Sequence, residues 1–136
     1  MKLLTFQARS FGWQPHVKTL AQGDDKPEGG RVEDAVVVWL HVEGSDMDDQ
    51  SRVFRHTLKH IKWIANKKQL RTVVLHFFAH LGGAHAEPDF ARALIERIGE
   101  RLTETGYTVH LTPFGYFCAW ELDVYGDSLA KVFKSI

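Results

Sequence analysis

The chain has 136 residues, of which 44% are hydrophobic and 25% charged, with 17 Lys and Arg balanced by 17 Asp and Glu. This composition predicts one soluble globular domain, and no apolar run approaches the roughly 18 residues of a membrane-spanning helix or has the form of a signal peptide. A single cysteine excludes an internal disulfide, so we expect a cytoplasmic protein in a reducing compartment.

The first half of the chain predicts two strands and a long helix. Leu3–Phe6 reads as a short strand, followed by an exposed loop rich in Gly, Pro and Asp over Gln22–Gly30. The nearly continuous apolar run Ala35–Val42 predicts a buried central strand. From Asp46, a plausible N-cap, to Asn66, apolar residues recur at the spacing of an amphipathic helix.

The second half continues with a buried strand over Thr72–Ala79, which ends before Gly82 and Gly83. A helix begins at Pro88 and is capped near Gly106. The remaining predicted elements are strands over Tyr107–Leu111 and Tyr116–Val124 and a short helix over Leu129–Phe133.

This order of elements predicts an α+β fold. Strand-helix-strand units make right-handed crossovers, which place both helices on one side of a mixed sheet. No internal repeat, low-complexity tract or linker interrupts the pattern, so residues 1–136 are expected to form a single domain.

The charges are segregated along the chain, although they sum to zero. No Asp or Glu lies between Asp49 and Glu87, and this stretch contains seven Lys or Arg residues. Four of these cations share one face of the predicted helix: Arg52, Arg55, Lys59 and Lys62. Trp63 points the same way. Two interpretations remain open, a solvated face with Trp63 packed on a neighbouring loop or subunit, or a face that follows phosphates and stacks a base.

Histidine and cysteine side chains are the candidates for chemistry. His80 follows the second buried strand, at an edge of the sheet where ligands commonly bind, whereas His76 is expected within the sheet as a hydrogen-bonded core residue. Strand alternation turns Cys118 toward the core, which favours an inert buried thiol. A reactive thiol would need His80 or a cation close enough to lower its pKa.

A metal site is a further hypothesis. His56 and His60 lie four residues apart on the predicted helix, but a zinc site needs three or four converging ligands, and His85 would have to supply a third. Phosphate-binding glycine loops, G-x-S-x-G and H-E-x-x-H are absent. We therefore predict neither a metal nor a cofactor.

Two short motifs point to a family. Phe78-Ala79-His80-Leu81 ends one predicted strand, and Pro113-Phe114-Gly115-Tyr116 begins another about thirty residues later. A third segment, Gly30-Arg31-Val32-Glu33-Asp34, leads into the strand that ends at Val42-Glu43. In this order and separation they resemble the N-terminal editing domain of archaeal threonyl-tRNA synthetases, which shares its fold with D-aminoacyl-tRNA deacylases. The resemblance covers nearly the whole chain.

The resemblance implies hydrolysis of the ester that joins L-serine to mischarged threonine tRNA. The activation site of a synthetase discriminates by only about 1–3 kcal/mol against the loss of one methyl group, so a second site removes the error. It also implies a homodimer, tRNA as a partner of the basic helix face, and threonyl-tRNA synthetase as a second candidate partner. The implied substrate-binding residues are Val42, Phe77, Phe78, Ala79, Phe114, Gly115, Tyr116 and Phe117.

The sequence departs from the family where a lysine just after the Phe-Gly-Tyr motif assists the attacking water. Cys118 occupies that position, Phe117 replaces the preceding tyrosine, and Lys131 aligns with a glutamate of the family's last helix. Loss of a cation that polarises the ester weakens transition-state stabilisation, and Lys131 reaching back into the site is a hypothesis that would restore it. The candidate catalytic residues are His80, Cys118 and Lys131.

The altered positions leave two functions open. The first is a free-standing editing protein that acts in trans on misacylated tRNA. The second is a non-catalytic relative that binds tRNA, an adenosine-containing ligand or a synthetase.

Overall fold

The computed structural model describes all of residues 1–136 and contains one six-stranded mixed sheet and two α-helices. The strands are β1 (Lys2–Lys18), β2 (Gly30–His41), β3 (Thr72–Phe77), β4 (Thr108–Leu111), β5 (Tyr116–Val124) and β6 (Lys131–Ser135), and the helices are α1 (Gln50–Lys67) and α2 (Pro88–Glu104). The strand order is β4-β3-β2-β1-β5, and β6 pairs with the first half of β1. β2, β3 and β4 are parallel, whereas β1 runs antiparallel to β2, β5 and β6.

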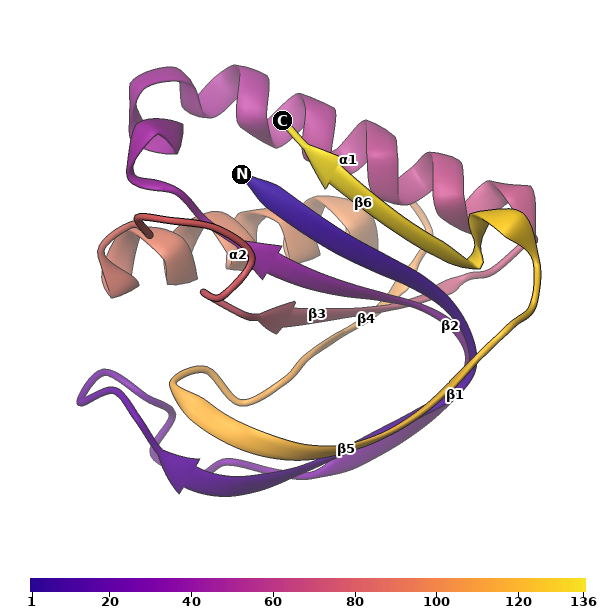
Figure 1. Cartoon of the computed structure of the whole chain (residues 1–136), viewed down its shortest axis with the longest axis horizontal. Coiled ribbons are helices and arrows are strands. Elements are labelled where there is room, and N and C mark those ends of the chain that lie inside the picture. The colour runs from indigo at the N-terminus through magenta and orange to yellow at the C-terminus, as the bar shows by residue number, and fades with distance from the viewer.

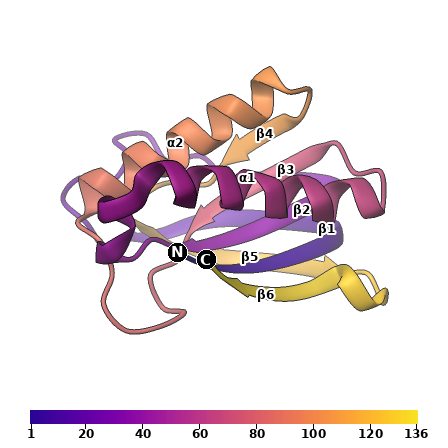
Figure 2. The ribbon, with the colours of Figure 1, turned by 90° about the horizontal axis from the view of Figure 1, so that it is seen from above.

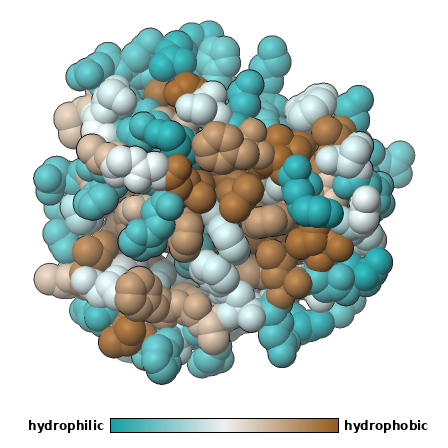
Figure 3. All heavy atoms as spheres, viewed as in Figure 1, coloured by the Kyte–Doolittle hydropathy of each residue, from teal (hydrophilic) through white to brown (hydrophobic).

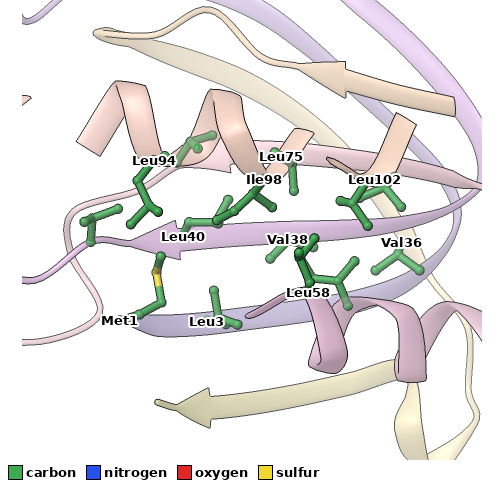
Figure 4. Close-up of a cluster of buried hydrophobic side chains, with 14 of the residues drawn as sticks. Met1, Leu3, Val36, Val38, Leu40, Leu58, Leu75, Leu94, Ile98 and Leu102 are labelled. Carbon is green, nitrogen blue, oxygen red and sulfur yellow. The ribbon is translucent and has the colours of Figure 1, made fainter. Parts of the chain in front are cut away.

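Both helices pack on one side of the sheet (Figures 1 and 2). Val38 and Leu40 of β2 turn toward them and share a core with Leu58 of α1 and Ile98 of α2 (Figure 4). β2 is buried on both faces, which is why its sequence is a continuous apolar run. No helix combines the length and apolarity needed to cross a membrane. The predicted α+β class, with a mixed sheet and both helices on one side, is confirmed.

β1 bends sharply, so that its second half, the start of β2 and β5 form a lower layer beneath the rest of β2 and β3 (Figure 1). Two register shifts interrupt its pairing with β5, as expected where a long strand bends. Phe11 and Trp13 from this half pack with Val37 of β2 in a second core between the layers. Only four residues, 112–115, connect β4 to β5 at the opposite end of the strand order. Because such a link reaches less than roughly 20 Å, these two edges must approach each other.

Two predicted elements at the ends of the chain are wrong. The first strand was expected only over Leu3–Phe6 but continues to Lys18. Backbone pairing with β2 and β5 keeps residues 7–18 extended, although their sequence has no apolar pattern typical of a strand. The helix expected over Leu129–Phe133 is a 3₁₀ turn, Ser128–Ala130, followed by β6. Pairing with the open edge of β1 satisfies the backbone of this segment as a strand.

The connection into α1 also differs from the prediction. Gly44–Asp49 form a 3₁₀ turn, and Asp49 rather than Asp46 caps α1 by accepting a hydrogen bond from the Arg52 N–H. Asp46 is buried, and its carboxylate binds the amino group of Met1 at 2.6 Å. This carboxylate therefore ties the start of β1 to the segment after β2.

Candidate functional site

A cavity of about 380 Å³ opens where β3 ends and β5 begins, at the left of Figure 1. It lies between the layer that contains β3 and the lower layer, on the side of the sheet away from the helices. The cavity is lined by Thr19, Leu20, His76, Phe77, Phe78, Ala79, His80, His85, Pro88, Gly115, Tyr116, Phe117, Cys118 and Trp120. The two motif segments found in the sequence thus contribute to one site.

Two predicted binding residues lie outside this lining. Val42 is buried on the helix side of the sheet, and its carbonyl accepts a hydrogen bond from the Ala86 N–H at 2.9 Å. Phe114 packs behind the cavity wall, with its ring centroid 4.7 Å from that of Phe77. The resemblance implied both as binding residues, whereas here Val42 holds the loop residue Ala86 and Phe114 packs on the lining residue Phe77.

The predicted cationic residues also lie away from the cavity. Lys131 is exposed on β6 and its Nζ donates to the Tyr125 carbonyl at 3.3 Å, so the structure does not bring this amine to the cavity. The four tRNA-binding candidates of the basic face, Arg52, Arg55, Lys59 and Lys62, are on α1. They occupy the helix side of the sheet, opposite the cavity (Figure 1).

No Lys, Arg, Asp or Glu side chain lines the cavity. Burial raises the pKa of the Cys118 thiol, so its sulfur is protonated and a poor nucleophile at neutral pH. Cys118 packs against the second core, as strand alternation predicted, and also borders the cavity. The site therefore offers aromatic rings and imidazoles in place of charges.

His76 is buried, as predicted, but its ring also borders the cavity, which the sequence did not indicate. Its Nδ1 lies 2.7 Å from Thr112 Oγ1, and the Thr112 hydroxyl donates to the Leu75 carbonyl at 3.5 Å. In the tautomer in which Nδ1–H donates to Thr112, the neutral ring carries a lone pair on Nε2. Nε2 has no protein partner and retains accessible surface, so it faces the cavity.

The wall that carries Gly115 is held by an ion pair behind it. Asp24 accepts hydrogen bonds from Arg92 Nη2 at 2.5 Å and from the Phe114 N–H at 3.1 Å. Gly115 has φ +76°, and a Cβ there would lie 2.7 Å from the Cα of Gly23. Glycine is therefore required at this turn by both its backbone conformation and the closeness of the neighbouring loop.

His41 holds the loop that forms the rim of the cavity. Its side chain is buried at the end of β2, its Nδ1 accepts a hydrogen bond from the Leu81 N–H at 2.9 Å, and its Nε2 lies 3.3 Å from the Ala84 carbonyl. Because Nδ1 accepts, Nε2 carries the proton and donates to Ala84. The neighbouring loop residues His80 and His85 are thereby positioned, and the sequence analysis missed this role.

Replacement of His41 by phenylalanine is expected to release this rim loop. Each lost hydrogen bond is worth about 1 kcal/mol, so amide exchange at Leu81 should accelerate about fivefold to tenfold. Hydrogen–deuterium exchange measures the effect directly. His60→Phe is the matched control, since His60 is another buried histidine but bonds to Thr5 under α1. Equal protection of Leu81 in the wild type and His41→Phe would contradict the role.

The histidines considered for a metal do not converge. His56 and His60 are on α1, and His85 is at the cavity on the other side of the sheet. No group of three or more His, Cys, Asp or Glu side chains is arranged to hold a metal ion. The hypothesis of a metal-binding module therefore has no site in this fold.

Comparison with known proteins places this geometry in context. A family model described as the archaea-specific editing domain of threonyl-tRNA synthetase matches residues 1–136. The threonine–tRNA ligase of Staphylothermus marinus is 33% identical over 144 residues, covering 100% of this chain and 22% of that protein. The ligase of Thermococcus kodakarensis is 32% identical over 112 residues, covering 82% of this chain and 18% of that protein. The chain thus spans about a fifth of the length of these relatives.

A solved structure shares the fold. The c-Myc DNA Unwinding Element Binding Protein matches with a TM-score of 0.70 and 12% sequence identity, and the match covers 100% of this chain and 99% of that one. At 12% identity this similarity shows that the two proteins share a fold and shows nothing about function.

Proposed function

Because this chain belongs to the archaea-specific editing-domain family of threonyl-tRNA synthetase, we propose that its cavity hydrolyses the aminoacyl ester of a mischarged tRNA. The substrate in this proposal is threonine tRNA that carries L-serine, cleaved in trans in the cytoplasm. A homodimer and an association with threonyl-tRNA synthetase are part of the same proposal.

The observation that carries the proposal is the convergence of the two motif segments on one cavity. Its volume of about 380 Å³ suits a small ligand, since such sites typically enclose roughly 300–1,000 Å³. The aromatic rings of Phe78, Tyr116 and Trp120 provide surfaces on which the terminal base of a tRNA can stack. The histidines at the same cavity supply groups that can transfer a proton.

We propose His76 as the general base of this reaction. Its Nε2 takes a proton from water while the water oxygen attacks the ester carbonyl carbon. The resulting imidazolium returns the proton to the ribose oxygen as the ester C–O bond breaks. The products are the free amino acid and a tRNA with a free hydroxyl. His80, at the exposed mouth, would orient the water or the substrate by a hydrogen bond.

One observation favours the non-catalytic alternative. The cavity contains no cation to polarise the ester carbonyl, and the Cys118 thiol is protonated at neutral pH. A relative that only binds an adenosine-containing ligand or the end of a tRNA would keep the aromatic walls and need no such cation. Lys131 does not enter either mechanism, because its amine has no contact with the cavity.

A deacylation time course distinguishes the two functions. We expect the wild type to hydrolyse seryl-tRNA faster than threonyl- or D-aminoacyl-tRNA. His80→Ala should slow the reaction about tenfold, the value of one hydrogen bond to the transition state, and Cys118→Lys should accelerate it by adding a cation. Glu100→Gln, exposed on α2, is the control. No turnover of any substrate, together with measurable tRNA binding, would favour the non-catalytic relative.

A further inference from the structure

We propose that the groove between α1 and β6 is a second RNA-binding site, in which Lys59 and Lys134 hold phosphates and the ring of Trp63 stacks a nucleobase. The groove lies on the helix side of the sheet, away from the cavity. The inference rests on the proposed function only for the choice of tRNA as the RNA.

The fold builds this groove from two distant parts of the sequence. It measures about 460 Å³ and is lined by His56, Lys59, His60 and Trp63 from α1 and by Val132 and Lys134 from β6. Thr5 Oγ1 bonds His60 Nε2 at 3.1 Å, which fixes α1 against β1 at the floor of the groove. Because β6 pairs with β1, its alternate residues Val132 and Lys134 face α1.

The charges of the groove are of one sign and are not neutralised. Lys59 and Lys134 are exposed, and neither forms an ion pair with a carboxylate. No acidic residue lies in the whole segment from 50 to 86. Burial and the nearby charge of Lys134 lower the pKa of His60 to about 4, so His60 itself is neutral. In Figure 3 the upper margin of the molecule, over α1, is mostly hydrophilic.

Trp63 provides the aromatic surface. Its side chain is 45% exposed, so it is not packed beneath a loop of its own chain. The Lys67 ammonium lies 5.9 Å from its ring centroid, and the His60 ring is 6.5 Å away. In a nucleic acid, phosphates can bind the unpaired cations while a neighbouring base stacks on the exposed indole. An acidic protein surface would bind the cations but has no base to stack on Trp63.

Binding of unacylated tRNA at several salt concentrations tests the groove without any hydrolysis. Lys59→Gln and Lys134→Gln should each weaken binding several-fold and reduce the slope of log K against log salt by about 0.7–0.9, one phosphate contact each. Trp63→Leu should weaken binding by about tenfold and leave the slope unchanged, because stacking releases no counterions. Arg101→Gln, an exposed cation of α2 outside both the groove and the cavity, is the control and should bind like the wild type.

Inorganic polyphosphate separates the two contributions, since it carries phosphates but no bases. Its binding should depend on Lys59 and Lys134 but not on Trp63. The proposal is overturned if all three variants bind tRNA as tightly as the wild type, or if polyglutamate competes as well as tRNA, which would indicate an acidic protein partner. Each substituted side chain is exposed, so the variants should unfold thermally at the same temperature as the wild type. A chain that binds tRNA here but hydrolyses nothing would contradict the proposed editing function and leave this inference intact.

Discussion

Replacing His76 with phenylalanine is expected to slow deacylation of seryl-tRNA by about 10²- to 10⁴-fold, the usual contribution of a general base. Phenylalanine keeps the ring that packs between β5 and the sheet but removes the Nε2 lone pair that faces the cavity. Single-turnover hydrolysis measures the chemical step. Thr112→Val, which removes the partner of Nδ1 but keeps Nε2, should cost much less than His76→Phe.

The pH profile of the wild type gives a second test of the same base. Burial lowers the pKa of His76 to about 4, so Nε2 is unprotonated above that value. The rate should therefore be constant above about pH 5 and fall as pH decreases through 4. The unfolded chain binds this proton near pH 6.5, so acidification also weakens folding, and circular dichroism must confirm the native state at each pH. Full activity of His76→Phe would exclude this residue as the base.

Asp46→Ala is expected to lower the free energy of unfolding by about 1.5–3 kcal/mol, because it removes one of the two carboxylates that bind a buried ammonium group. The amino group of Met1 is fully buried, with Asp46 Oδ1 at 2.6 Å and Glu43 Oε1 at 2.7 Å. Asp46 Oδ2 also accepts the Glu43 N–H at 2.8 Å, so the substitution leaves this half-buried donor without its partner. Urea unfolding followed by circular dichroism measures the change.

Asp48→Ala is the matched control for this prediction. Asp48 belongs to the same 3₁₀ turn but is exposed and forms no ion pair, so its replacement should change stability by no more than about 0.5 kcal/mol. Similar unfolding midpoints for Asp46→Ala and Asp48→Ala would show that the buried pair contributes little net stability.

The sequence predicted the elements that have a periodic apolar face. It did not predict the strands that form only through backbone pairing with other strands. β2, β3, α1 and α2 each bury a face against a core, so their sequences carry the pattern of that face. The second half of β1 and all of β6 owe their strand conformation to partners far away in the sequence. Short-range patterns contain no record of such partners.

The site shows the same division. Phe78-Ala79-His80 and Gly115-Tyr116 were singled out because they lie at strand ends, and the cavity does contain them. His41 carries no local signal of its role, because its partners Leu81 and Ala84 are about forty residues away. His41 binds the backbone N–H of Leu81 and the backbone carbonyl of Ala84, and these groups are present whatever side chains the loop carries. The loop sequence therefore does not indicate the contact.

By itself, the sequence determined the fold class, the family and the position of the two motif segments along the chain, because these depend on local apolar periods and on short strings of residues. Only the tertiary structure decided which side chains share a space. The bend of β1 brings β5 under β3, so His76 and Cys118 border one cavity, while pairing of β6 with β1 carries Lys131 away from it. The physical reason is that the bend and the edge pairing arise from contacts distant in sequence, which no local pattern encodes.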